Sequence, residues 1–173
     1  MPRPTGGTAR TGVYPGSFDP LTVAHVAIAD AAVARFGLER LDLVISEQAL
    51  GKEHHGQAPV EARIAAIERV ASSGRPWLRA RVTDLRLISD IAEGYDVCVV
   101  GADKWHQLRD PAFYDGSEAA RDAALARLPR LAVAPRAGVD LPPDHGAVLL
   151  DLAEAHREVS SSAVRDGRID WLA

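Results

Sequence analysis

The chain has 173 residues, of which 47% are apolar and 25% are charged, which suits one domain with a substantial hydrophobic core. A net charge of −4 argues against a protein that coats DNA or RNA, although it is compatible with a local cationic site for a small phosphate ligand. No apolar run approaches the ~20 residues that cross a bilayer, so we expect no membrane partner.

Residues 1–10 carry no apolar segment of the kind found in a secretory signal. We expect them to form a flexible lead-in to one domain over residues 11–173. Cys98 is the only cysteine in the sequence, so an internal disulfide is excluded and the chain fits the reducing cytoplasm. The valines around Cys98 predict a buried thiol.

In chain order, short β-branched runs alternate with longer segments of helical periodicity. The predicted strands are 11–14, 41–46, 78–82, 96–100, 131–134 and 147–152. The predicted helices are 22–36, 60–72, 86–92, 104–108, 117–128 and 160–166. Strands that are continuous apolar runs between helices indicate a parallel sheet covered on both faces. Right-handed crossovers then give a doubly wound, Rossmann-like α/β fold.

The loop after the first predicted strand, with the start of the next helix, is the first candidate site. Ligands of doubly wound sheets bind beyond the carboxyl ends of the strands, and a helix N-terminus there attracts phosphate. Gly16 allows a ligand to approach the backbone, and Thr22 is a candidate N-cap. Thr22 and His25 share one face of the first helical turn and offer a hydroxyl and an imidazole to one anion. Alternatively, Thr22 only caps the helix and His25 packs against the sheet edge.

The stretch VSSSAVR, residues 159–165, is the second candidate site. Ser160 is a candidate helix cap, and Ser161 and Ser162 add hydroxyl and N–H donors at the positive end of the helix. Arg165, one turn further on, can hold two phosphate oxygens. Taken alone, this stretch favours a capped surface helix, and its pairing with the first candidate site favours a phosphate site.

The stretch GSFDPLTVAH resembles the signature of the nucleotidyltransferases, in which G-[ST]-F-D-P is followed by [HT]-x-G-H. The chain has Thr22 and His25 at the outer positions and Ala24 where the family has glycine. VSSSAVR is similar to the I-S-S-T-x-I-R of the same family. GADKWHQL, from residue 101, and LAVAPRAG, from residue 131, resemble segments of the nicotinate or nicotinamide mononucleotide adenylyltransferases. Phosphopantetheine adenylyltransferases share the threonine form of the first motif.

This resemblance implies transfer of the adenylyl group of ATP to a phosphate-bearing small molecule, with release of pyrophosphate. Mg²⁺ would be coordinated mainly by the phosphates, with few protein ligands. Thr22 and His25 would hold the α-phosphate and the transition state. Ser161 and Arg165 would hold the leaving pyrophosphate. Asp103 would accept hydrogen bonds from the ribose hydroxyls. The other residues expected around the nucleotide are Gly16, Ser17, Phe18, Gly101, Ser160 and Ser162.

The acceptor site is less sharply defined. Lys52, in the loop after the second predicted strand, is a candidate contact for a substrate phosphate. Trp105 is either a stacking partner for a base or pyridine ring or a packing residue, and Phe113 and Tyr114 offer further flat faces. The histidine pair at 54–55 has no partner spacing that would support a metal site.

Several alternatives stay open at this point. The acceptor is a nicotinate or nicotinamide mononucleotide, or else phosphopantetheine, and ATP is not distinguished from CTP. Ala24 leaves room for a non-catalytic nucleotide-binding sensor of the same fold. A homo-oligomer is compatible with the sequence, which does not set the number of copies.

Overall fold

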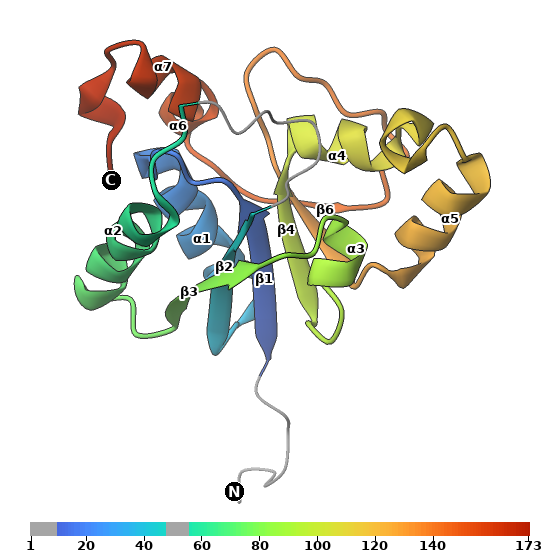
Figure 1. The fold of residues 1–173 in the computed structure, drawn as a ribbon, viewed down its shortest axis with the longest axis horizontal. Helices are drawn as coiled ribbons and strands as arrows, with labels where there is room; N and C mark the ends of the chain where they lie inside the picture. Colours follow the sequence, from blue (N-terminus) through green and yellow to red (C-terminus); the bar gives the residue numbers. More distant parts are fainter. Residues whose placement is uncertain (1–9, 48–55) are drawn as a thin grey trace, which may run out of the picture.

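A computed structural model describes residues 10–47 and 56–173 of the chain. Within them, six parallel strands form one sheet in the order β3-β2-β1-β4-β5-β6 (Figure 1). The winding reverses between β1 and β4, as in a doubly wound fold, so the predicted fold class is confirmed. The strands are β1 (Thr11–Gly16), β2 (Arg40–Ser46), β3 (Leu78–Thr83), β4 (Val97–Gly101), β5 (Arg130–Ala134) and β6 (Val148–Leu149).

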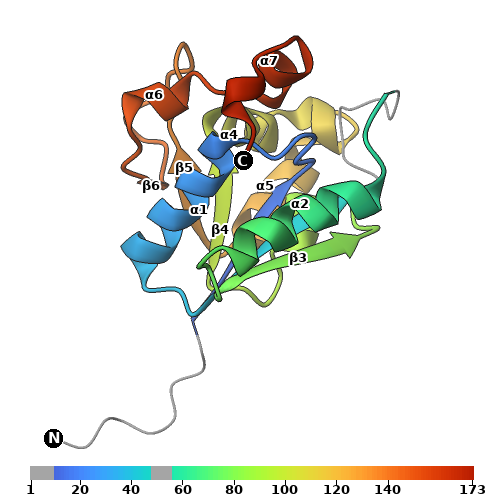
Figure 2. The same ribbon diagram turned by 90° about the vertical axis from the view of Figure 1, so that its left-hand side faces the viewer.

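Helices cover both faces of the sheet. Figures 1 and 2 show α1 and α2 on one face and α3, α4 and α5 on the other. The helices are α1 (Val23–Phe36), α2 (Val60–Ser72), α3 (Ile88–Ile91), α4 (Ala102–Arg109), α5 (Glu118–Arg127), α6 (Glu154–Arg157) and α7 (Ser161–Arg165), with 3₁₀ turns η1 (Pro111–Tyr114) and η2 (Ile169–Trp171). No helix in the described part of the chain is both long and apolar enough to cross a membrane.

The core lies in two layers because side chains of a strand alternate between the faces. On β4, Val97 and Val99 pack in the layer under α1 and α2, while Cys98 and Val100 pack in the layer under α3, α4 and α5. Burial on both sides is what a parallel sheet requires. Cys98 is fully buried, which confirms the predicted thiol environment and raises its pKa to about 12.

Two predicted elements are markedly shorter in the structure. The strand predicted at 147–152 spans only Val148–Leu149, and further on the Leu152 carbonyl accepts a hydrogen bond from the Arg157 guanidinium. The helix predicted at 86–92 keeps only Ile88–Ile91. The residues predicted as a lead-in lie outside the described residues except Arg10, whose guanidinium donates to the Phe36 carbonyl over 2.7 Å.

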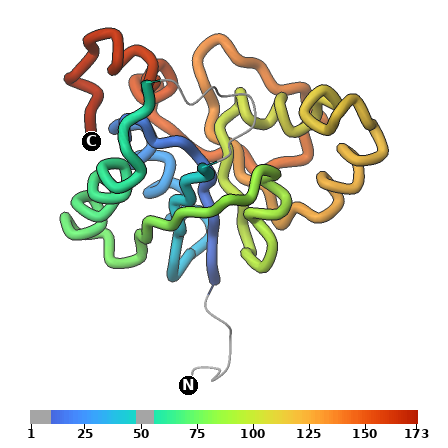
Figure 3. Tube along the Cα trace, viewed as in Figure 1, coloured from blue at the N-terminus to red at the C-terminus, as the bar shows by residue number. Residues whose placement is uncertain are grey.

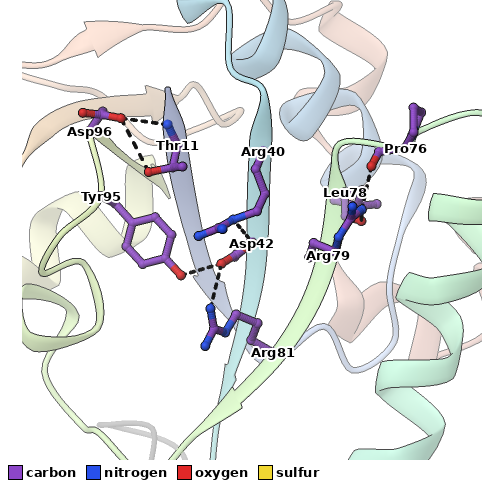
Figure 4. A network of polar contacts seen from close by, with 9 residues as sticks. All are labelled: Thr11, Arg40, Asp42, Pro76, Leu78, Arg79, Arg81, Tyr95 and Asp96. Atoms are coloured by element: carbon purple, nitrogen blue, oxygen red, sulfur yellow. Dashed lines mark hydrogen bonds and ion pairs between the residues drawn. The ribbon is translucent and has the colours of Figure 1, made fainter. Parts of the chain in front are cut away.

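A buried ion cluster supports the half of the sheet away from the carboxyl ends (Figure 4). Asp42 of β2 is 1% exposed and accepts the Tyr95 hydroxyl at 2.6 Å. Arg81 of β3 lies 3.4 Å from the same carboxylate, and Arg40 lies 3.1 Å from its other oxygen. Burial, together with the bond to Asp42, raises the pKa of Tyr95. Since a buried carboxylate needs such partners, this cluster is structural.

Candidate active site

The carboxyl ends of β1 and β4 frame the main cavity of interest. The ladder between the two strands consists of Gly12–Val97 and Val13–Cys98, whereas β1 pairs with β2 as far as Gly16. A cavity of about 350 Å³ lies at this switch point of the sheet, where doubly wound folds bind ligands. Its lining includes the predicted residues Gly16, Ser17, Phe18, Thr22, His25, Gly101, Asp103, Ser160, Ser161, Ser162 and Arg165.

Thr22 and His25 form a capping box at the start of α1. The Thr22 N–H donates to His25 Nδ1 over 3.0 Å, and the His25 N–H donates to the Thr22 hydroxyl over 3.4 Å. A backbone N–H can only donate, so Nδ1 is the acceptor nitrogen and the ring proton lies on Nε2. The cap therefore fixes both the orientation and the tautomer of an imidazole that lines the cavity. The predicted cap is confirmed, both side chains also line the cavity, and their contact with an anion stays a prediction.

Aromatic rings hold the other side of the imidazole. The Phe18 ring lies 5.1 Å from that of His25 and 5.2 Å from that of Tyr14, edge-on to both. Phe18 is 1% exposed and has a φ of 47°, in the left-handed region. A Cβ on Gly16 would lie 2.8 Å from the Phe18 ring, so this glycine makes room for Phe18 as well as bordering the cavity.

The C-terminal segment docks on the loop that precedes α1 (Figure 3). The Ser161 hydroxyl donates to the Pro20 carbonyl over 2.9 Å, and the Arg165 guanidinium donates to the Asp19 carbonyl and to the Ser162 hydroxyl. Ser160 caps α7 by accepting the Ala163 N–H, as the sequence predicts. The two motifs, at opposite ends of the sequence, are thus bonded to one another beside the cavity.

The cavity concentrates positive charge in an acidic chain. Among the described residues, its lining holds the cationic side chains of Lys104, Arg136, Arg157 and Arg165 and one carboxylate, that of Asp103. Asp103 and Arg136 form an ion pair of 2.6 Å, and both are about half exposed. Such a lining suits a polyphosphate.

Sequence reasoning missed several members of this lining. Arg136 lay inside the quoted stretch LAVAPRAG, so the motif contained the signal. Arg157 and His156 precede the serine motif, and neither has a local pattern that marks it. Lys104 and Gln107 lie one turn apart on α4, and their position becomes meaningful only once α4 is placed at the carboxyl end of β4.

A second, smaller cavity of about 90 Å³ adjoins the first. Its apolar wall consists of Leu87, Ile88, Ile91, Leu108, Phe113 and Tyr114, with Arg86 beside them. Tyr114 is 9% exposed and its hydroxyl donates to the Leu108 carbonyl over 2.9 Å. The apolar and aromatic side chains of this wall suit contact with a flat ring.

Trp105 lines neither of these two cavities. It is 4% exposed, packs in the core layer under α4, and donates its indole N–H to the His145 carbonyl over 3.3 Å. Of the two alternatives that the sequence offered, the structure has packing, so the candidate role as a stacking partner is withdrawn. Lys52, the other candidate contact for the acceptor, lies outside the described residues.

Arg63 of α2 is a buried cation with a structural role. It is 6% exposed and donates to the carbonyls of Ala58 and Ser17, each over 3.0 Å. Asp19 accepts the Ala58 N–H over 3.2 Å. These bonds fasten the segment before α2 to the loop that carries the first motif.

Residues 13–167 match the cytidylyltransferase-like family, and the chain belongs to it. The resemblance to nucleotidyltransferases is therefore confirmed. A "Probable nicotinate-nucleotide adenylyltransferase" of Gloeobacter violaceus is 28% identical over 193 residues, which cover 95% of this chain and 88% of the relative. A phosphopantetheine adenylyltransferase of Clostridium perfringens is 37% identical over 60 residues, which cover 35% of this chain and 34% of the relative.

The fold also matches a solved structure. The Plasmodium falciparum nicotinic acid mononucleotide adenylyltransferase complexed with NaAD aligns with a TM-score of 0.64, covering 92% of this chain and 83% of that one. At 12% identity, the likeness establishes the shared fold.

Proposed function

We propose that the chain transfers the adenylyl group of ATP to a pyridine mononucleotide, specifically nicotinate mononucleotide, and releases pyrophosphate. The observation that carries this proposal is the one cavity that brings Thr22 and His25 together with Arg165. The curated relative that spans nearly the whole chain is named for this acceptor, which supports the choice.

The reaction needs no protein nucleophile, because the acceptor phosphate is already an anion. One of its oxygens forms a bond to the α-phosphorus of ATP, while the bond from that phosphorus to the bridging oxygen of the β-phosphate breaks. The electron pair leaves with pyrophosphate. The protein contributes positioning and charge stabilisation, as in other phosphoryl transfers. Mg²⁺ carried on the phosphates supplies further charge neutralisation when bound.

Each cavity side chain then has a task. The Nε2–H of His25 donates to the α-phosphate, where charge develops in the transition state. The start of α1 borders the same cavity through Thr22, Ala24 and His25, and the positive end of the helix dipole favours the anion there. Arg165 holds the leaving pyrophosphate beside the Asp19 loop. Asp103, oriented by Arg136, accepts the ribose hydroxyls.

Phosphopantetheine is the second candidate acceptor. Thr22 and the match to the Clostridium perfringens enzyme favour it. The aromatic slot beside Phe113 and Tyr114 favours a flat ring over an acyclic chain. A non-catalytic sensor is the third candidate, since Ala24 is 5% exposed and borders the cavity. In any of these roles a chain with one buried thiol suits the cytoplasm.

A pyrophosphate-release screen with ATP or CTP against a panel of phosphate acceptors tests the proposal. We expect release that depends on nicotinate mononucleotide and ATP, with the dinucleotide as the second product. ATP binding without release for any acceptor would identify a sensor and contradict the proposal.

A further inference from the structure

The two cavities share a wall, and that wall holds one cationic side chain. The residues that line both cavities are Pro15, Gly16, Ser17, Lys104 and Gln107. Of the described residues, Lys104 is the single cation common to both linings. A ligand that extends from the apolar slot into the nucleotide cavity must therefore pass beside Lys104.

The proposed acceptor, a pyridine mononucleotide, is long enough to extend from the apolar slot into the nucleotide cavity. Under the proposed function, its ring occupies the slot of Phe113 and Tyr114, and its phosphate reaches toward the α-phosphate held near His25. The acceptor phosphate then lies at the shared wall. Two anions must approach there to within bonding distance, and a cation placed between them lowers their repulsion.

The local structure sets the ammonium at that place. Lys104 lies in the first turn of α4, three residues after Gly101 ends β4, and it is partly buried. The Gln107 amide oxygen, one turn further on, accepts the ammonium over 2.7 Å. This contact orients the ammonium along the helix.

We propose that Lys104 binds the phosphate of the acceptor, which is the attacking group of the reaction. This inference rests on the proposed function for the geometry of the acceptor. It assigns the phosphate of the acceptor to Lys104, while Arg165 and His25 serve the phosphates of ATP. A lysine suits this position, because its ammonium is a compact point charge that can contact a single phosphate group.

The test compares ligands with and without their phosphate. Dissociation constants are measured by calorimetry for nicotinate mononucleotide and for its nucleoside, with a non-hydrolysable ATP analogue in excess. We expect the wild type to prefer the mononucleotide by roughly 10- to 100-fold, as for one charge-assisted hydrogen bond. In Lys104→Met this ratio falls to near one, while the affinity for the nucleoside is unchanged.

Two further variants sharpen the result. Lys104→Arg keeps the charge and retains part of the preference for phosphate. Arg109→Met removes a cation from the same helix, where it stacks on Trp105 at 4.9 Å and lines neither cavity, and leaves the ratio unchanged. If Lys104→Met weakens mononucleotide and nucleoside equally, or leaves their ratio intact, the inference is wrong.

The same experiment separates the inference from the proposed function. The pair of 4′-phosphopantetheine and pantetheine is measured in parallel. A Lys104-dependent preference for phosphate in that pair alone would uphold the inference and refute the proposed acceptor. A wild type that binds neither pair would overturn both.

Discussion

The imidazole of His25 is held on two sides, by the capping box with Thr22 and by the edge of the Phe18 ring. Because Nδ1 accepts the Thr22 N–H, the ring proton lies on Nε2, which is the nitrogen that we propose donates to a developing negative charge. We expect His25→Ala to lower kcat by about 10²- to 10³-fold, the loss typical of one such donor. Initial-rate kinetics with ATP and nicotinate mononucleotide measure this effect.

The matched control is His156→Ala, which removes another imidazole from the same cavity lining. We expect a much smaller effect on kcat there, since no capping contact ties His156 to the start of α1 among the described bonds. Equal losses in the two variants would mean that the imidazoles act only through the shape of the cavity.

Two glycines of the cavity differ in what a methyl group would meet. A Cβ at Gly101 has no atom within 4 Å, and its φ is −77°, so Gly101→Ala places a methyl in ligand space without backbone strain. We expect the unfolding free energy to change by less than about 1 kcal/mol. We expect the affinity for ATP to fall roughly tenfold, which is equivalent to about 1.4 kcal/mol of binding free energy. Urea unfolding and calorimetry measure the two quantities.

For Gly16→Ala we expect a loss of folding stability, in contrast to Gly101→Ala. Its Cβ would lie 2.8 Å from the Phe18 ring, and overpacking of this kind costs about 1–3 kcal/mol. A stable Gly16→Ala together with an unfolded Gly101→Ala would show that the two roles are interchanged.

At the scale of elements, α2 is joined to the first motif through Arg63. Its guanidinium satisfies the carbonyls of Ser17 and Ala58 in a buried site. Arg63→Leu leaves both carbonyls without this donor, and we expect a loss of about 1–3 kcal/mol in unfolding free energy. The exposed Arg69 of the same helix is the control, since Arg69→Leu should change stability by less than about 0.5 kcal/mol. Equal losses in a urea titration would contradict the structural role.

The α7 segment makes a separate prediction. Arg165, which lines the cavity, donates to the Asp19 carbonyl, and we propose that it also binds the leaving pyrophosphate. We expect Arg165→Ala to raise the KM for ATP more than that for the acceptor, and Arg165→Lys to restore only part of the loss, because a point charge does not reproduce the planar fork. Arg168→Ala, which breaks an exposed pair with Asp170, should change neither constant. A rise confined to the KM of the acceptor would reverse the assignment of the two sites.

The sequence predicted the elements well because their signals are local. Runs rich in apolar residues marked most of the strands, although β3 alternates with arginines and β6 has only two residues; the Thr22 cap and Gly37, with its φ of 61°, bound α1. The roles of Arg63 and Trp105 were not predictable in this way. Both depend on which face of a helix turns inward, and tertiary packing decides that. The cations of the cavity come from four separate elements or loops, so only the sheet order reveals their convergence.

At the scale of the whole molecule, an acidic chain places four cationic side chains and, among the described residues, one carboxylate around one cavity at the sheet's switch point. The small apolar slot adjoins this cavity, and the residues that line both include Lys104 and Gln107. This arrangement predicts a two-part ligand, with a polyphosphate on one side and a ring-bearing phosphate on the other. The central claim is therefore adenylyl transfer between these two partners.

The most direct test is a matched measurement of kcat/KM for nicotinate mononucleotide and for 4′-phosphopantetheine, each with ATP and Mg²⁺, by pyrophosphate release. The account predicts faster turnover of nicotinate mononucleotide, because its ring fills the slot of Phe113 and Tyr114 and its ribose offers two vicinal hydroxyls. Faster turnover of 4′-phosphopantetheine, or release of pyrophosphate with neither acceptor, would contradict it.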